Sequence, residues 1–343
     1  MKKLIAVLLI VGLLLALGAC SKAPASPASP GNAAPAATKN AGAAVTDTST
    51  VAVGAVILAR DDVNEEEIYA LVSTIFENVS AITQQHAKGG ELDLAFAAGV
   101  TSVPYHPGAA RYFQEKGFTV ASVKEGAGTG AKANLTFGTG GDTGTYYGFG
   151  SVLANYVSSA NDFTVTAVTS GGSKANIEDM DANDVQLGFA QSDVMSYAYN
   201  GERLFDGKPI KGFSVVAALY MEQVQIVTTN GSIASVADLK GKTVSIGAVG
   251  SGVYFNAIDV LNAYGMTEKD IKPVYQSFGD SADSLKDGKI DAAFIVAGAP
   301  TTAITDLAAS GSVYLVSLDD AHIKSLLAAS PFYSAYVIPA GTY

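Results

Sequence analysis

The stretch that most constrains the fold of this chain runs from Leu135 to Val157, with the sequence LTFGTGGDTGTYYGFGSVLANYV. It begins as a short apolar strand, continues into a loop rich in glycine, and ends with apolar residues at helical spacing. Glycines at such a junction let the backbone approach a ligand closely, and the first N–H groups of a helix carry partial positive charge. The stretch therefore predicts a strand, a glycine loop and a helix that together hold an anionic group.

The spacing of these glycines excludes two nucleotide-binding motifs. A dinucleotide fingerprint needs Gly-x-Gly-x-x-Gly, but Gly138 and Gly140 are followed by Thr143 at the required place, and Gly144 comes one residue late. A phosphate P-loop needs a lysine after its last glycine, whereas Thr145 follows Gly144. A plain glycine turn between strand and helix remains the alternative to an anion site.

Length and charge limit the remaining classes of function. A chain of 343 residues suggests two domains. Its net charge of -11 argues against a nucleic-acid surface, which requires clustered Lys and Arg. Because Arg60, Arg111 and Arg203 all lie outside the glycine motifs, we expect backbone N–H groups and hydroxyls to hold a bound carboxylate.

The first 20 residues resemble the signal peptide of a bacterial lipoprotein. Lys2 and Lys3 precede an apolar run that closes with Leu-Gly-Ala-Cys, ending at Cys20. In such a signal the cysteine is lipidated and becomes the first mature residue. Cys20 is the only cysteine of the chain, so lipid attachment is its best explanation, with a plain secretory signal as the alternative. Residues 21–46 are rich in Ala, Pro and Ser and are predicted to form a flexible tether.

The pattern of the glycine loop recurs along the chain. Before it, we expect a strand over 50–60, one long helix over 64–88, a helix ending near 117, and a small, polar linker over 124–133. After it, the strand over 163–168 runs into Thr-Ser-Gly-Gly-Ser and a helix. The next strand, 185–190, ends at Gln-Ser-Asp. Ligands of open α/β sheets bind at the carboxyl ends of strands, where these polar groups lie.

The second half of the chain repeats the first. Residues 213–229 form one β-rich stretch that is too long for a typical strand unless it crosses between domains. A second glycine loop, 247–252, follows a short strand and opens a helix. Further strands are predicted over 274–278 and 290–296. Two α/β units with facing glycine loops define a cleft between two domains.

Several of these motifs together resemble the TAXI family, the solute receptors of tripartite ATP-independent periplasmic (TRAP) transporters. The motifs are Gly138-Thr-Gly-Gly141, Gly144-Thr-Tyr-Tyr147, Ser170-Gly-Gly-Ser173, Gln191-Ser-Asp193, Gly250-Ser-Gly252 and Tyr105-His-Pro-Gly-Ala109. The resemblance implies an α/β, two-lobe type II periplasmic binding protein-like fold that closes over a solute and delivers it to a membrane permease. Family members with assigned ligands bind glutamate, glutamine or related carboxylates such as 2-oxoglutarate. We therefore expect an exported, lipid-anchored monomer that is not an enzyme and needs no cofactor or metal.

The order of the segments along this chain differs from that in the TAXI family, in which the glycine loop follows the signal peptide and tether. Here segments like 50–118 precede the loop instead of coming last, so the sequence looks circularly permuted. The predicted parts are the signal peptide 1–20, the tether 21–46, lobe 1 from 56–120 and 134–222, lobe 2 from 47–55 and 223–343, and a linker 121–133 between the usual termini. Crossing strands near 53–58 and 219–225 would form the hinge, with Tyr343 beside residues 46–50.

The predicted ligand-binding residues come from the loops and strand ends of both units. They are Thr139, Gly140, Gly141, Thr143, Gly144, Thr145, Tyr146, Ser170, Gly172, Ser173, Asn176, Gln191, Asp193, Tyr220, Gly250, Ser251, Gly252, Ala297 and Gly298. A carboxylate is expected to bind N–H groups and hydroxyls of Thr139, Gly140, Gly141, Thr145, Ser173, Ser251 and Gly252. Asp193 pairs with a ligand ammonium or caps a helix. Gln191 is expected to bond a ligand carboxylate or amide, and Tyr146 and Tyr220 form apolar walls or pack in the core.

Two other classes of function compete with a solute receptor. A serine hydrolase lacks support, because Gly250-Ser251-Gly252 has the wrong spacing for a nucleophile elbow and no histidine adjoins a nucleophile in sequence. A lipid-anchored surface antigen or adhesin without a small ligand is the alternative. An apolar cleft favours that alternative, whereas a polar cleft lined by facing glycine loops favours the receptor.

Overall fold

The computed structural model describes residues 46–343, so the predicted signal peptide, Cys20 and most of the tether lie outside the described residues. The helices are α1 (Glu65–Glu77), α2 (Val79–Gln85), α3 (Leu94–Ala97), α4 (Pro107–Glu115), α5 (Thr145–Ala160), α6 (Ser173–Asp181), α7 (Ser192–Asn200), α8 (Val253–Ala263), α9 (Phe278–Lys286), α10 (Thr302–Ser310) and α11 (Asp320–Ala329). Short 3-10 turns are η1 (Ala87–Glu91), η2 (Arg203–Phe205), η3 (Val236–Leu239) and η4 (Glu268–Asp270). Among the helices described, none is both long and apolar enough to cross a bilayer.

The strands form one mixed sheet with two similar halves. They are β1 (Thr48–Arg60), β2 (Leu135–Gly138), β3 (Val165–Val168), β4 (Leu187–Gln191), β5 (Phe213–Thr228), β6 (Thr243–Ser245), β7 (Lys272–Val274), β8 (Ala292–Ala297), β9 (Tyr314–Leu315) and β10 (Ser334–Ile338). The main order is β3-β2-β4-β1-β5-β8-β6-β7, with β10 added beside β1 and β9 beside β5. In the first half the parallel strands β3-β2-β4 are followed by the antiparallel strand β1. In the second half the parallel strands β7-β6-β8 are followed by the antiparallel strand β5. The two halves therefore share one topology.

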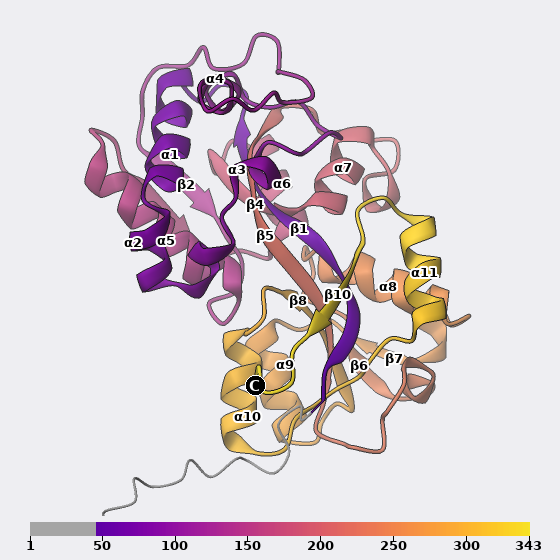
Figure 1. Cartoon of the computed structure of the whole chain (residues 1–343). Coiled ribbons are helices and arrows are strands. Elements are labelled where there is room, and N and C mark those ends of the chain that lie inside the picture. The colour runs from indigo at the N-terminus through magenta and orange to yellow at the C-terminus, as the bar shows by residue number, and fades with distance from the viewer. Residues whose placement is uncertain (1–45) are drawn as a thin grey trace, which may run out of the picture. The chain divides into compact units, whose positions relative to one another are not determined.

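The long strands β1 and β5 run side by side through both halves (Figure 1). Their apolar residues belong to different cores along their length. On β1 the core changes between Val53 and Ala55, and on β5 it changes between Tyr220 and Val224. The chain thus has a two-lobe, type II-like α/β fold in which two paired strands connect the lobes.

The long helix predicted over 64–88 is wrong, because the structure has two helices with a break at Asn78. The Asn78 side chain donates to the carbonyl of Thr74 at 2.8 Å, and its backbone N–H bonds Ile75. Asparagine competes in this way for backbone groups that a continuing helix would use. The apolar spacing on both sides of the break is helical, which is why the sequence pattern does not reveal it.

The strand predicted over 274–278 is misplaced. The strand β7 already ends at Val274, and α9 begins at Phe278, within the predicted strand. The hydroxyl of Ser277 caps α9 by accepting a hydrogen bond from the N–H of Asp280 at 3.1 Å. Ser277 is therefore the N-cap of α9, and Phe278 is its first residue.

The C-terminal strand lies beside the first described strand. Thr48 of β1 is paired with Ile338 of β10, and the N–H of Ala340 donates to the carboxylate of Asp47 at 2.9 Å. The last strand, β10, ends at Ile338. The side chain of Tyr343 reaches Thr301, whose N–H donates to the Tyr343 hydroxyl at 3.0 Å.

Candidate functional site

Four helices begin at the wall of one cavity, α5 and α6 from one lobe and α8 and α9 from the other. The residues before α5, α6 and α8 are Gly144, Gly172 and Gly252, and none of these three caps has a side-chain hydrogen bond. A glycine cap leaves the first N–H groups of its helix free for another acceptor. The partial positive charges of several helix ends therefore converge on one small space, which suits an anion.

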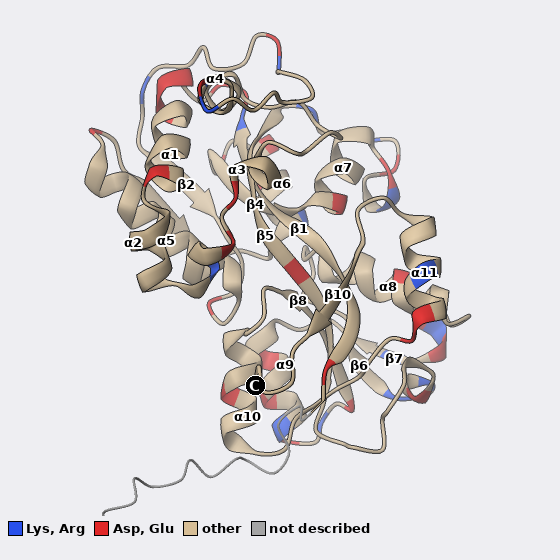
Figure 2. Ribbon diagram, in the orientation of Figure 1, with Lys and Arg blue, Asp and Glu red and all other residues tan. Residues whose placement is uncertain are grey.

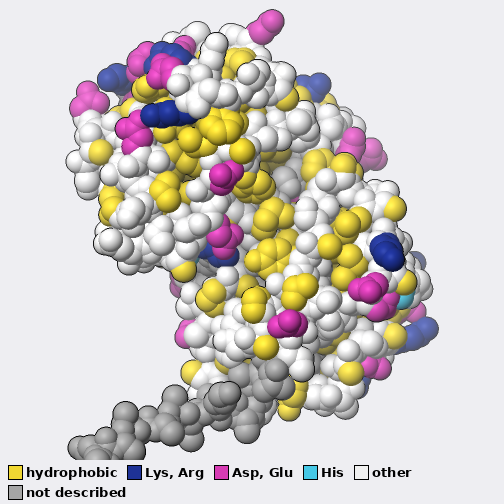
Figure 3. All heavy atoms as spheres, viewed as in Figure 1, with side chains coloured by type: hydrophobic (Ala, Val, Ile, Leu, Met, Phe, Trp, Pro, Cys, Tyr) yellow, Lys and Arg dark blue, Asp and Glu magenta, His cyan; other side chains and the backbone are white. Residues whose placement is uncertain are grey.

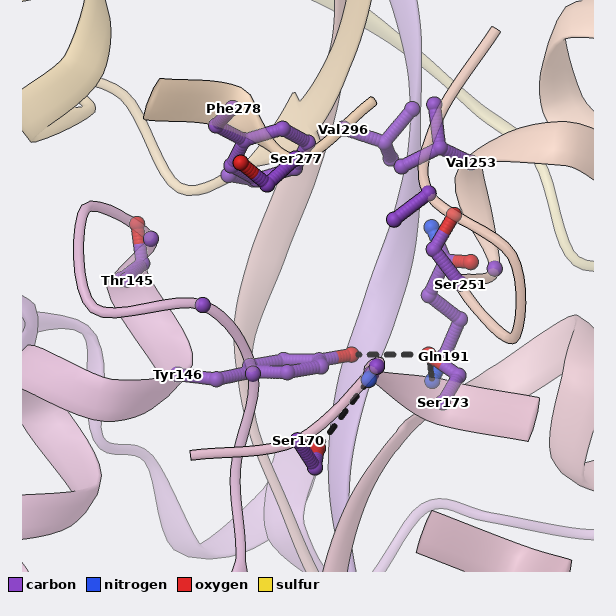
Figure 4. Close-up of a pocket in the computed structure, with 18 of the residues that line it drawn as sticks. Thr145, Tyr146, Ser170, Ser173, Gln191, Ser251, Val253, Ser277, Phe278 and Val296 are labelled. Carbon is purple, nitrogen blue, oxygen red and sulfur yellow. Dashed lines mark hydrogen bonds between the residues drawn. The ribbon is translucent and has the colours of Figure 1, made fainter. Parts of the chain in front are cut away.

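The cavity is small and joins loops far apart in the sequence. The space open to water inside it is about 80 Å³, enough for only a small solute. Predicted site residues that line it are Gly140, Gly141, Gly144, Thr145, Tyr146, Ser170, Gly172, Ser173, Gln191, Ser251, Gly252 and Ala297. Both glycine loops and the loop before α6 thus meet as the sequence predicted. Figure 4 shows Tyr146 extending across the cavity toward Ser173.

The other predicted residues stand behind the lining and support it. They are Thr139, Thr143, Asn176, Asp193, Tyr220, Gly250 and Gly298. The Asn176 amide donates to the carbonyls of Thr139 at 2.7 Å and Phe189 at 2.8 Å, so it ties two strand ends together. The carbonyl of Gly298 accepts from the Thr145 hydroxyl at 3.0 Å, which fixes the α5 loop against the other lobe.

The remaining supporting residues have structural contacts of their own. The Thr139 hydroxyl donates to the carbonyl of Val168 at 2.6 Å, and the carbonyl of Gly250 accepts from Ala175 at 2.9 Å. The carbonyl of Thr143 accepts from Ala303 at 3.3 Å. Tyr220 is a core residue, 1% exposed, which matches the packing alternative stated for it. These side chains shape the cavity without lining it.

Sequence reasoning missed several lining residues. They are Gly171, Glu222, Ala248, Val253, Ser277, Phe278 and Val296. Ser277 and Phe278 fall within the strand predicted over 274–278. Val253 and Val296 are apolar residues without a distinguishing pattern. Glu222 did carry a signal, because it is an acidic residue within the otherwise uncharged strand β5. In Figure 2 the red of an acidic residue interrupts β5 in mid-strand.

Tyr146 connects the α5 loop to the centre of the cavity. Its ring stacks on Phe189 with centroids 4.6 Å apart and planes 4° from parallel, which fixes the direction of the side chain. The Tyr146 hydroxyl donates to Oε2 of Glu222 at 2.6 Å and lies 3.5 Å from the hydroxyl of Ser173. Tyr146 is therefore both a wall of the cavity and a polar contact within it.

Glu222 is the acidic side chain of the cavity lining and is only 2% exposed. Burial raises the pKa of its carboxyl to about 8, and the nearby Asp193 acts in the same direction. The Tyr146 hydrogen bond and the charge of Lys88 oppose this rise in pKa without cancelling it. A carboxyl so placed is mostly protonated at neutral pH and changes charge when its surroundings change.

Gln191 presents an unused acceptor at the end of β4. Its amide nitrogen donates to Asn256 at 2.9 Å, and its backbone N–H donates to the Ser173 hydroxyl at 3.1 Å. The side-chain oxygen Oε1 is buried and has no hydrogen-bond partner among the described residues. The hydroxyl of Ser251 is likewise buried and without a partner among them. Unpaired buried groups are costly, so a cavity that holds two of them is suited to a polar ligand.

Behind Gln191 a second polar network joins the lobes. Asn256 of α8 donates to Oδ2 of Asp193 at 3.0 Å and to the Tyr333 hydroxyl at 2.9 Å. The Tyr333 hydroxyl donates to Asp259 at 3.0 Å, and Asp259 also forms an ion pair with Arg203. Asp193 is fully buried, and burial raises its pKa to about 7. Asp193 does not line the cavity, and Gln191 rather than Asp193 is the N-cap of α7. Asp193 lies in the first turn of α7, where the backbone N–H groups of Asp193 and Val194 partly oppose the rise in its pKa.

The described residues that line this cavity include neither Lys nor Arg. Within residues 46–343 there is also no group of three His, Cys, Asp or Glu side chains arranged to hold a metal ion. Any anion in the cavity would therefore be held by N–H groups and hydroxyls.

A separate hollow lies beside β1 and is apolar. It is lined by residues such as Val56, Phe96, Val100, Met221 and Phe332, and none of its lining residues is charged. Figure 3 shows hydrophobic side chains gathered on this face over β1, β10 and α3. Because it lacks the converging donors of the first cavity, this hollow is not the candidate solute site.

A model of the NMT1-like family matches residues 29–117 and 137–343, which is well over half of the chain. The chain belongs to the NMT1-like family. This family is periplasmic binding protein-like, a family of binding proteins and not of enzymes.

The chain also resembles solved structures of ligand-binding proteins, at low sequence identity. The alkanesulfonate-binding protein SsuA from Xanthomonas axonopodis pv. citri, bound to MOPS, is 21% identical with a TM-score of 0.38, over 54% of this chain and 61% of SsuA. An ancestral arginine-binding protein bound to arginine is 16% identical with a TM-score of 0.35, over 54% of this chain and 79% of that protein. The GluR0 ligand-binding core with L-glutamate is 13% identical with a TM-score of 0.36, over 62% and 87%. This chain thus spans about three fifths of the length of the sulfonate-binding protein it matches.

Proposed function

We propose that this NMT1-like protein is an extracytoplasmic receptor that captures a small carboxylate between its two lobes. The observation that carries the proposal is the convergence of glycine-capped helix ends from both lobes on one cavity. The cavity is lined by glycine loops and hydroxyls, which supports a receptor over a surface antigen or adhesin without a small ligand.

The proposed solutes are glutamate, glutamine and related carboxylates such as 2-oxoglutarate. A hydrogen bond to a charged group contributes roughly 1.5–3 kcal/mol. Micromolar binding requires about -8 kcal/mol, so several converging donors are enough without an arginine. The free N–H groups of α5, α6 and α8 and the hydroxyls of Ser170 and Ser173 supply such donors.

The proposed role of the receptor is to deliver the captured solute to a TRAP permease in the membrane. A ligand that contacts residues of both lobes, such as Ser173 and Gly252, favours the closed over the open arrangement. Closure would create the surface that a permease recognises. The lipid proposed on Cys20 would keep the receptor at the membrane.

The proposed architecture is circularly permuted, with lobe 1 from 56–120 and 134–222 and lobe 2 from 47–55 and 223–343. The family match is split around residues 118–136, where the former chain ends would be joined. The pairing of β1 with β10 puts the new ends side by side, as a permutation requires. The change of core on β1 and β5 near the proposed boundaries also supports this division.

Thermal unfolding of the purified chain tests the proposed function. The protein is heated alone and with millimolar glutamate, glutamine, 2-oxoglutarate, succinate or a sugar as a neutral control. A ligand at about 100 times its dissociation constant stabilises the folded state by about 2.7 kcal/mol, which raises the melting temperature by several degrees. A rise with a carboxylate and none with the sugar supports the proposal. A cooperative melt that no carboxylate shifts contradicts it.

A further inference from the structure

The cavity contains acceptors as well as donors. The Tyr146 hydroxyl bonds Glu222 and lies 3.5 Å from the hydroxyl of Ser173. The same Ser173 hydroxyl accepts from the backbone of Gln191 at 3.1 Å. Two hydroxyls thus connect Glu222 to the backbone of Gln191, and the side chains of both residues belong to the lining of the same cavity.

The direction of the Gln191 amide is fixed from behind. The Tyr333 hydroxyl donates its hydrogen to Asp259 and so accepts from Asn256, which means that the Asn256 amide points its nitrogen at Tyr333 and its oxygen at Gln191. Gln191 must then donate its nitrogen to Asn256, which leaves its oxygen Oε1 free. This oxygen is an acceptor that no described residue satisfies.

We infer that Glu222 and the Gln191 side-chain oxygen bind the ammonium group of an amino acid solute, whose carboxylate is held by the glycine-capped helix ends. This inference rests on the proposed function and narrows its solutes to those that carry an ammonium next to the carboxylate. A zwitterion matches the cavity because donors from the helices and acceptors from β4 and β5 meet there. A 2-oxo acid of the same carbon skeleton has no ammonium group to donate to either acceptor and leaves Gln191 Oε1 unpaired.

Binding of an ammonium group also changes the charge of Glu222. The groups that face its carboxyl are Tyr146 from α5, Tyr220 on its own strand, Lys88 from η1 and Asp193 from α7. Together with burial they leave the pKa at about 8 in the empty cavity. An ammonium beside the carboxyl favours the charged form, so the proton of Glu222 passes to solvent when the solute binds.

The alternative arrangement predicts that solute binding releases no proton. A protonated Glu222 would donate its hydrogen to a solute carboxylate and would keep its proton on binding. The number of protons exchanged on binding therefore separates the two arrangements, independently of affinity.

Isothermal titration calorimetry of the purified chain tests the inference with matched solutes. L-Glutamate is compared with 2-oxoglutarate, and L-alanine with pyruvate, because each pair differs only at the α-position. We expect the amino acid of a pair to bind at least tenfold more tightly at pH 7. Titrations in phosphate and Tris, whose ionisation enthalpies differ, should show release of about one proton per amino acid bound.

Substitution of Glu222 makes the test specific to this residue. Glu222→Gln keeps the shape and removes the charge, so it should weaken amino acid binding at least tenfold, change 2-oxo acid binding less than threefold and abolish proton release. Glu125→Gln, which removes an exposed carboxyl outside the cavity lining, is the matched control and should change neither. Thermal unfolding of each variant verifies that it is folded. Tyr146→Phe, which removes the hydroxyl but keeps the ring, should weaken the preference for amino acids by a smaller factor.

Three results overturn the inference. Equal binding of amino and 2-oxo acids, or binding of an amino acid without proton release, contradicts the assignment of Glu222 while leaving a carboxylate receptor standing. Failure of every carboxylate to bind to a folded chain contradicts the proposed function and the inference together.

Discussion

Two buried carboxyl groups, Glu222 of β5 and Asp193 of α7, have different surroundings. Glu222 faces the cavity, where Tyr146 is the side chain that donates to it and where acceptors such as Gln191 Oε1 are unpaired. Asp193 faces the rear, where Asn256 joins it to Tyr333 across the lobes. Each region has an unpaired acceptor among the described residues, Gln191 Oε1 at the front and Asp193 Oδ1 at the rear. At the rear, however, the second oxygen of Asp193 bonds Asn256 and so connects the two lobes.

This difference indicates a division of labour between the two regions. A ligand site needs polar groups whose partners arrive with the solute, since groups already paired within the protein gain little from it. A contact between lobes needs partners that are present in the closed protein. We therefore expect changes at the front to alter binding and changes at the rear to alter stability.

The largest expected effect is on the pH dependence of stability. The pKa is raised in the folded protein from 4.5 to about 8 for Glu222 and from 3.8 to about 7 for Asp193. Below the unfolded pKa both states hold these protons, and as pH rises the unfolded state loses them first. The free energy of unfolding should therefore fall between about pH 4 and pH 8, with each unit of pKa difference corresponding to about 1.4 kcal/mol.

Urea unfolding of the empty protein across this pH range measures the effect. Glu222→Gln should flatten the upper part of the decline, up to about pH 8. A free energy of unfolding that stays constant or rises over the same range would contradict the description of both carboxyls.

Asp193→Ala tests the rear region. It removes the acceptor of Asn256 and leaves a buried amide donor with one partner fewer, so the free energy of unfolding should fall by about 2–3 kcal/mol. Chemical denaturation at pH 4, where the raised pKa of Asp193 costs the folded state little, measures the loss. Glu222→Gln is the front-side comparison, and the division between the regions fails if it destabilises the protein as much.

Gly252→Ala tests closure at the front. A Cβ at this position would lie 1.6 Å from Oε1 of Gln191, although the backbone itself, with φ of -75°, accepts alanine. The closed cavity should be obstructed, and solute affinity should fall by about 10–100-fold, or about 1.4–2.8 kcal/mol. Calorimetry measures the affinity. Gly212→Ala, where a Cβ would meet nothing within 4 Å, should bind as the unchanged protein does.

Arg203→Gln should have the smallest effect. The ion pair of Arg203 with Asp259 joins the lobes at the rear, but the Arg203 side chain is 36% exposed and water screens the pair. Solute affinity should fall only a few-fold, and the fall should shrink as salt is added. A loss as large as that of Gly252→Ala would show that the rear contact controls closure.

Much of the fold could be predicted from local sequence. Glycine loops after strands, the repeated order of elements and the long stretch of β5 all follow from spacing and composition along the chain. The break at Asn78 and the early start of α9 could not be predicted, because side-chain caps there override an apolar pattern that also fits a longer element. The loop residues of the cavity were predictable for the same local reason, since glycine and hydroxyl residues mark helix starts.

The sequence by itself determined which loops supply donors, because a glycine before a helix frees N–H groups wherever the helix lies. Only the tertiary structure decided which acceptors face them. Glu222 and Asp193 are both carboxyls beside apolar residues in sequence, and β5 carries one to the cavity while α7 carries the other to the rear. The pKa and the partners of a buried charge depend on groups brought together from distant segments, so the chain order alone does not reveal them.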